Sequence, residues 1–195
     1  MEKIKIAEEW WKKASQNNKN RYKIFYDGLP FKVVKPILEI GGGNGSFLDY
    51  MDIDEATIFD IAGEESLKRE GYKFITRDIT KQIFSSPKFK TIFVMETLEH
   101  IKNPLYLMAQ VYNILDDDGN CYIAVPYTPL DLERKNQENP YNCHVCRWKK
   151  KELIDQMEKL GFEVKVIKQR RRFKNTAFWL PHCWLVLELK KRLEH

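Results

Sequence analysis

A glycine-rich stretch that directly follows an apolar run constrains this chain more than any other feature of its sequence. Residues 37–40 are apolar except for Glu39, and such a run is typical of a strand buried on both faces of a sheet. Four glycines follow within five positions: Gly41, Gly42, Gly43 and Gly45. Residues 46–51 are then predicted to open a helix. A strand, a glycine turn and a helix in this order let backbone N–H groups face a ligand with no Cβ atoms in the way.

The spacing of these glycines separates two kinds of nucleotide-binding turn. The dinucleotide fingerprint G-x-G-x-x-G would need a third glycine where this chain has Ser46, which argues against a nicotinamide-dependent enzyme. The sequence instead reads acid-x-Gly-x-Gly-x-Gly, with Glu39 as the acid. A carboxylate in a buried strand needs a donor to offset its desolvation. The spacing resembles the first motif of class I S-adenosylmethionine-dependent methyltransferases.

Length and composition predict one domain. The chain has 195 residues, of which 43% are hydrophobic and 31% charged, as in an ordinary globular protein. The net charge of +5 permits an anionic partner without requiring one. No apolar run is long enough to span a bilayer, and four cysteines are too few for a disulfide scaffold, so we expect a cytoplasmic protein without membrane association.

Three segments divide the chain. Residues 1–35 begin with an amphipathic helix over 2–14 and end in an aromatic stretch, which predicts either a cap over one edge of the core or a lid over the ligand. Residues 36–192 form the predicted donor-binding domain. The last three, 193–195, look like the remnant of an expression tag.

Two acids follow the next two predicted strands. Asp60 ends the strand at 56–59, where a carboxylate can accept both ribose hydroxyls of an adenosine. Asp78 follows the strand at 72–76, where it can hydrogen-bond an adenine amino group while Ile79 packs on the ring. Each acid has an alternative role as the N-cap of the helix that follows it. We also predict that Ile61 contacts the donor.

A second motif lies at the end of the fourth predicted strand, residues 91–95. It reads E-x-L-E-H-I over residues 96–101, and Asn103-Pro104 then starts a helix. A turn is predicted at 116–119 and a fifth strand at 121–125. Beyond a loop at 127–147, a helix is predicted at 148–160, followed by strands at 163–167 and 183–189. This succession resembles the small-molecule branch of the class I methyltransferases over about residues 36–168.

The resemblance implies a fold and a donor site. The fold is α/β, with a Rossmann-like, doubly wound, mostly parallel seven-stranded sheet, helices on both faces and an antiparallel last strand. Gly41, Gly43 and Gly45 would admit the methionine end of S-adenosylmethionine near Glu39. Met95 and Glu96 would line the donor with their backbone. His100 is the predicted base or substrate contact.

A divalent metal is a further implication of the same motif. Glu96, Glu99, His100 and the distant His144 resemble the metal ligands of small-RNA 3′-terminal 2′-O-methyltransferases. The ion would chelate a vicinal diol or catechol and lower the pKa of the attacked hydroxyl. Relatives without a metal use the same glutamate and histidine for capping and pocket lining, and this chain has Cys146-Arg147-Trp148 where the RNA enzymes have a different motif. A zinc site built on Cys143 and Cys146 lacks a second C-x-x-C.

These observations predict an S-adenosylmethionine-dependent methyltransferase that acts on a small molecule, at oxygen. Two alternatives stay open: a metal-assisted 2′-O-methyltransferase of RNA ends, and a methyltransferase-like protein that binds the donor without turnover. Arg170, Arg171 and Arg172 could meet phosphates, but a solvated turn accounts for them as well, so nucleic acid is not the favoured partner. The sequence predicts neither the acceptor nor the oligomeric state.

Overall fold

The computed structural model describes residues 22–23, 25–61, 70–79, 81, 88–127, 144–170 and 183–192. The helix predicted at 2–14, residues 64–69 of the helix expected after Asp60, most of the one expected after Asp78, and residues 193–195 lie outside the described residues. Cys143, Arg171 and Arg172 lie outside them too.

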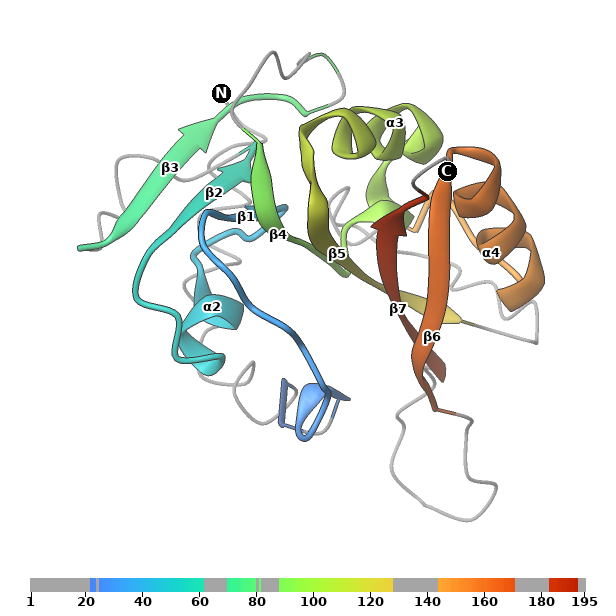
Figure 1. The fold of residues 1–195 in the computed structure, drawn as a ribbon, viewed down its shortest axis with the longest axis horizontal. Coiled ribbons are helices and arrows are strands. Elements are labelled where there is room, and N and C mark those ends of the chain that lie inside the picture. Colours follow the sequence, from blue (N-terminus) through green and yellow to red (C-terminus); the bar gives the residue numbers. More distant parts are fainter. Residues whose placement is uncertain are drawn as a thin grey trace.

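A seven-stranded mixed sheet runs through the described part of the chain in the order β3-β2-β1-β4-β5-β7-β6 (Figure 1). Its strands are β1 (Ile37–Ile40), β2 (Ala56–Asp60), β3 (Tyr72–Thr76), β4 (Phe89–Met95), β5 (Leu115–Tyr127), β6 (Phe162–Arg170) and β7 (Cys183–Lys191). The pairs among β1 to β5 are parallel, and β7 is antiparallel to both β5 and β6. The predicted fold class is confirmed.

Besides the helical residues 22–23 and 25–26, four helical elements accompany these strands in the described residues. They are α2 (Ser46–Tyr50), the 3₁₀ turn η1 (Leu98–His100), α3 (Pro104–Ile114) and α4 (Lys150–Lys159). The start of α3 follows its sequence signals, since Asn103 Oδ1 accepts a hydrogen bond from the N–H of Tyr106 at 3.3 Å and Pro104 occupies the first turn. None of the described helices is long and apolar enough to cross a membrane.

The two faces of the sheet are covered by different parts of the chain. Alternate strand residues such as Leu38, Ile92 and Ile123 pack in one apolar cluster with α3 and α4. Their neighbours Ile37, Phe93 and Tyr122 face the other way, in a cluster with α2 and the aromatic segment around residue 25. Figure 1 shows α3 and α4 on one side of the sheet, and α2 with the blue segment on the other.

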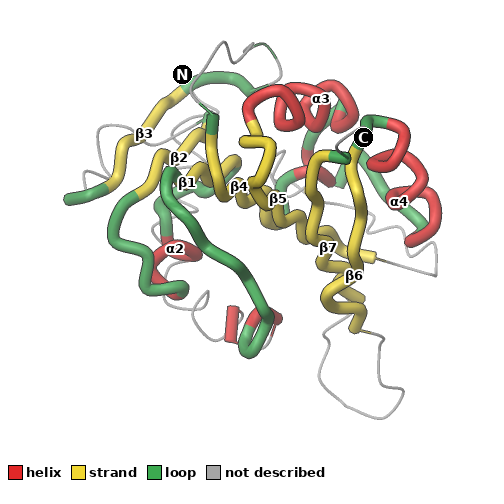
Figure 2. The backbone as a smooth tube through the Cα atoms, in the orientation of Figure 1, coloured by secondary structure: helices red, strands yellow, loops and turns green. Residues whose placement is uncertain are grey.

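Non-helical backbone leads from the helical turn at 25–26 to β1, as the green tube in Figure 2 shows. Two sheet side chains hold this path. The buried Thr91 hydroxyl accepts a hydrogen bond from the N–H of Val34 at 2.8 Å and donates one to the Val34 carbonyl at 2.9 Å. The Tyr122 hydroxyl accepts the N–H of Lys32 at 2.7 Å. Side chains of the sheet therefore supply hydrogen-bond partners for backbone groups of this irregular segment.

The predicted turn at 116–119 is wrong, because β5 begins at Leu115. Phe89 pairs with Leu115 and Thr91 pairs with Asn120. Residues 116–119 of β5 therefore lie opposite the single residue Lys90 of β4, and the register of the two strands shifts there. Lys90 Nζ lies 2.5 Å from Asp118 Oδ1 and 3.6 Å from Asp116 Oδ1. The acidic residues that were predicted to form a turn thus lie at a bulge-like irregularity within a longer strand. Other boundaries moved less: β4 begins earlier than predicted, and α4 begins after Lys149.

We expect Thr91→Val to destabilise the protein by about 2–3 kcal/mol, because it leaves the N–H and carbonyl of Val34 without the buried hydroxyl that pairs with both. Thr91→Ser is the matched control, since it keeps the hydroxyl and loses one methyl group, worth about 1 kcal/mol. Urea unfolding at fixed pH measures both. A Thr91→Val protein as stable as the wild type would contradict this account.

Candidate functional site

The glycine loop bends sharply between β1 and α2. Gly41, Gly43 and Gly45 have φ values of +73°, +53° and +74°, which side chains rarely adopt. The Gly41 N–H donates to the Phe59 carbonyl at 2.7 Å and thereby ties the loop to the end of β2. A Cβ on Gly41 would overlap the side chain of Thr97, and one on Gly45 would come within 2.8 Å of Ile58 Cδ1. Packing as well as backbone geometry therefore requires glycine here.

Two carboxylates flank this loop. Glu39 is only 2% exposed, and within the described residues its Oε2 makes no hydrogen bond. Asp60, at the end of β2, accepts the Gly43 N–H on Oδ2 at 2.8 Å. Burial, and secondly the charge of Asp60, raise the pKa of Glu39 to about 8. A buried carboxyl group with an unused oxygen beside the loop is suited to a cationic ligand.

The end of β4 lies against the same loop. The Thr97 Oγ1 atom is 3.1 Å from the Ile40 carbonyl oxygen and 3.0 Å from that of Met95, so it joins the ends of β1 and β4. Glu96 has a φ of +53°, which is uncommon for a residue with a side chain, and its N–H donates to Ala124 at 2.8 Å. Strand order reverses between β1 and β4, and open α/β sheets bind their ligands at such a switch point.

The structure brings together three of the four predicted metal ligands. Donor atoms of Glu99, His100 and His144 all lie within 4.8 Å of one another. The His100 and His144 rings meet edge to face with centroids 5.1 Å apart, and His100 Nε2 is 3.9 Å from Glu99 Oε1. The Glu99 carbonyl accepts the N–H of Val145 at 2.7 Å, which fixes the segment carrying His144 against η1.

Among the described residues, neither Glu96 nor Cys146 joins this group. The Glu96 carboxylate instead accepts a hydrogen bond from the Tyr26 hydroxyl at 2.8 Å. Cys146 Sγ lies 3.1 Å from the carbonyl oxygen of Ile101 and is not among the grouped donor atoms. The described residues therefore offer a site of three ligands.

The remaining predicted donor contacts lie along the same edge of the sheet. The Arg77 N–H donates to the Asp60 carbonyl at 2.9 Å, which places Asp78 beside the end of β2. Asp78 is half-buried, and its Oδ2 lies 3.5 Å from the exposed Lys81 Nζ. Ile79 is also half-buried, Ile61 is 45% exposed and Met95 is buried.

Sequence reasoning missed three residues of this site: Tyr22, Tyr26 and Thr97. The Tyr22 hydroxyl lies 3.2 Å from Ser46 Oγ, at the start of α2. The aromatic stretch around these tyrosines was predicted only as a cap or lid, and no local pattern pairs Tyr26 with a residue 70 positions away. Thr97 stands inside the E-x-L-E-H-I motif, and its position between the two acids was the one available signal.

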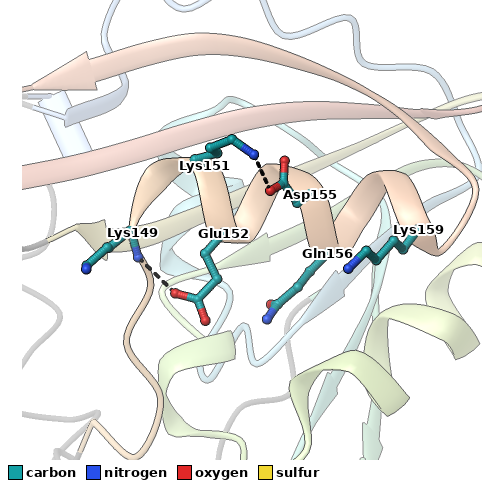
Figure 3. Close-up of a pocket in the computed structure, with 6 residues that line it drawn as sticks. All are labelled: Lys149, Lys151, Glu152, Asp155, Gln156 and Lys159. Carbon is teal, nitrogen blue, oxygen red and sulfur yellow. Dashed lines mark hydrogen bonds and ion pairs between the residues drawn. The ribbon is translucent and has the colours of Figure 1, made fainter.

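A shallow depression on α4 contains none of the predicted site residues. Its lining comprises Lys149, Lys151, Glu152, Asp155, Gln156 and Lys159. Figure 3 shows Glu152 and Gln156 on one side of the helix, and Lys151 paired with Asp155 at 2.6 Å on the other. Gln156 also accepts the indole N–H of Trp148 at 2.9 Å. The depression is therefore part of the solvent-exposed surface of α4 and contains no predicted site residue.

Comparisons with known proteins identify the family. A family described as a methyltransferase domain matches residues 13–166, which is most of the chain. The chain belongs to this family and is an S-adenosylmethionine-dependent methyltransferase. None of the curated proteins matches it in sequence.

Solved structures share the fold. A chain from the complex of the Haloferax volcanii Trm112 methyltransferase activator with a proposed methyltransferase has a TM-score of 0.72 at 14% identity, covering 98% of this chain and 99% of that one. A Thermotoga maritima enzyme named a SAM-dependent methyltransferase, possible histamine N-methyltransferase, has a TM-score of 0.63 at 16% identity, with coverages of 93% and 99%. The plantazolicin methyltransferase BpumL, solved with SAH, has a TM-score of 0.59 at 15% identity, with coverages of 92% and 83%.

We expect the stability of the wild type to fall, relative to Glu39→Gln, as the pH rises from about 4.5 to 8. The raised pKa means that the folded state holds a proton on Glu39 that the unfolded state has lost, so the difference changes by up to roughly 1.4 kcal/mol per pH unit. Glutamine cannot ionise and removes this dependence. Urea unfolding of both proteins across this range measures it, and parallel pH profiles would contradict the prediction.

Proposed function

We propose that this methyltransferase transfers the methyl group of S-adenosylmethionine to a small-molecule acceptor, at oxygen. The observation that carries the proposal is the glycine loop between Glu39 and Asp60, at the point where β1 and β4 meet. A loop kept free of side chains and flanked by two carboxylates suits a ligand with an ammonium group, a sulfonium and a ribose.

Each predicted donor contact has a role in this proposal. Gly41, Gly43 and Gly45 admit the methionine end of the donor. Its ammonium group would be a positively charged partner for the buried Glu39 carboxylate, whose Oε2 makes no hydrogen bond within the described residues. Asp60 accepts the ribose hydroxyls. Adenine is held by Asp78 and by the aliphatic side chains of Ile61 and Ile79, and the backbone of Met95 and Glu96 lines the donor. Their common place along one sheet edge supports these assignments.

Proton transfer is assigned to His100. When bound, S-adenosylmethionine supplies an activated methyl group: the acceptor oxygen forms the new C–O bond while the S–CH₃ bond breaks and leaves its electron pair on sulfur. His100 takes the proton that the acceptor hydroxyl loses, as a general base. Glu99 Oε1, 3.9 Å from His100 Nε2, would stabilise the imidazolium. Buried aromatic rings such as Phe47 and Tyr26 exclude water beside the loop.

Structural relatives support a small acceptor. Their names include a plantazolicin methyltransferase and a magnesium protoporphyrin IX methyltransferase, each solved with SAH. The family assignment favours turnover over a protein that only binds the donor, and a product assay measures that turnover.

Gly41→Ala is expected to weaken donor binding at least tenfold, because its Cβ would displace Thr97 from the junction of β1 and β4. Gly28→Ala is the matched control. Gly28 also has a positive φ, +69°, but a Cβ there meets nothing within 4 Å, so the variant should bind as the wild type does. Calorimetry with S-adenosylmethionine measures both, followed by product assays on catechols, sugars and RNA ends. A wild type that binds NAD and not S-adenosylmethionine would overturn the function.

A metal-assisted version of the reaction is the second candidate, favoured by the grouping of Glu99, His100 and His144. Two imidazoles and one carboxylate are ligands suited to zinc or manganese. These side chains would hold a divalent ion, which supplies a Lewis acid for a hydroxyl of a vicinal diol, a catechol or an RNA 3′ end. In this version His100 is a ligand and not the base. Glu96, whose Oε1 accepts the Tyr26 hydroxyl, is not grouped with these three residues and would have to move toward them to be a fourth ligand.

We expect His144→Ala to lower the affinity for Mn²⁺ or Zn²⁺ by tenfold or more, since it removes one of three ligands. Lys149→Ala, nearby on the exposed surface, is the control and should bind metal as the wild type does. Calorimetric titration of each metal into chelator-treated protein gives the affinities. A wild type that binds neither ion, or whose product formation is unaffected by chelator, would exclude the metal and leave the donor site untouched.

A further inference from the structure

We propose that Tyr26 is a positioning residue, whose hydroxyl orients Glu96 and so completes the donor site from outside the sheet. The inference rests on the proposed function and extends it to a segment that precedes the first strand. Tyr26 belongs to the helical turn at 25–26, whereas Glu96 follows β4, and the two are 70 positions apart in the chain.

The hydrogen bond has a buried donor and a constrained acceptor. Tyr26 is 2% exposed, and its hydroxyl donates to Glu96 Oε1 at 2.8 Å. The positive φ of Glu96 places this residue in a conformation that needs support from its surroundings. Its N–H is held by the Ala124 carbonyl, so backbone and side chain are fixed by different partners. A hydrogen bond to a carboxylate is among the stronger kinds that a side chain can make.

Packing fixes where the Tyr26 hydroxyl lies. The ring meets Phe47 edge to face at 5.4 Å between centroids and lies 6.0 Å from Tyr22. The Tyr22 ring also packs against Phe47, at 5.6 Å, and its hydroxyl reaches Ser46 Oγ. The two tyrosines therefore contact both sides of the switch point, at the start of α2 and at the end of β4.

The same segment is attached to the sheet by contacts that do not involve the switch point. The Lys32 N–H donates to Tyr122, and Lys168 Nζ donates to the Phe25 carbonyl at 2.6 Å. Tyr122 also donates to Glu188 Oε1 at 3.3 Å. The hydroxyl of Tyr122 thus anchors the segment on the sheet, whereas that of Tyr26 acts at the donor site. Tyr122 is therefore a suitable control for Tyr26, because its hydroxyl holds the same segment at a point away from the donor site.

The contact also separates two acids of one motif. Tyr26 holds the carboxylate of Glu96, while Glu99 faces His100. In this proposal Glu96 is held in place to line the donor, whereas Glu99 lies next to the imidazole rings on the acceptor side. Loss of the Tyr26 hydroxyl should therefore affect the donor and leave the acceptor alone.

Tyr26→Phe is expected to raise the Kd of S-adenosylmethionine and of S-adenosylhomocysteine about ten- to 150-fold, the range of a hydrogen bond to a charged group. In the product assay the KM of the donor should rise while that of the acceptor stays within about twofold. Because Tyr26 acts through Glu96, the double variant Tyr26→Phe/Glu96→Gln should bind the donor no more weakly than the weaker single variant.

Tyr122→Phe should lower the melting temperature but leave the donor Kd within about twofold of the wild-type value. The proposal is overturned if Tyr26→Phe binds the donor as the wild type does, or if Tyr122→Phe weakens binding equally, since the effect would then be general loosening. It is also overturned if the effects of Tyr26→Phe and Glu96→Gln simply add. A wild type that binds no donor would refute the proposed function together with this inference, whereas normal binding by Tyr26→Phe refutes this inference alone.

Discussion

The contact of Thr97 with the glycine loop is the constraint on which the rest of the site depends. Thr97 Oγ1 lies within hydrogen-bond distance of carbonyl oxygens at the ends of both β1 and β4, and Gly41 has no room for a side chain beside it. The two strand ends are thereby held at a fixed separation. The loop leaves β1 with a positive φ, and Glu96 leaves β4 with another. The bend that exposes backbone to a ligand is a consequence of this junction.

The two carboxyl groups beside the glycine loop repel each other when both are ionised and no cation lies between them. Glu39 and Asp60 both lie beside the loop, and one of them is almost wholly buried. A site designed only for stability would replace Glu39 by an apolar residue, because a buried carboxyl group with an unused oxygen opposes folding. Such a group is typical of functional sites, where a ligand of opposite charge offsets the cost of burying the carboxylate. The family to which the chain belongs uses a donor with two positive charges.

The face of the sheet opposite α3 and α4 carries the N-terminal aromatic segment. The N-terminal aromatic segment and α2 share one apolar cluster on that face, and the segment's backbone is satisfied by Thr91 and Tyr122. Its tyrosines then extend to Ser46 and Glu96. The segment that packs on this face therefore also contacts the residues next to the glycine loop and β4. Glu99 and His100, in the second half of the E-x-L-E-H-I motif, group with His144.

The strands, the glycine bend and the acids at the strand ends could be predicted from the sequence, because apolar periodicity and the conformational freedom of glycine are local properties. Three features could not be predicted in this way: the pairing of Tyr26 with Glu96, the contact of His144 with His100, and the start of β5 before the acidic residues and not after them. Those outcomes depend on how distant segments pack across a sheet and on strand register, and neither is encoded in the spacing of neighbouring residues.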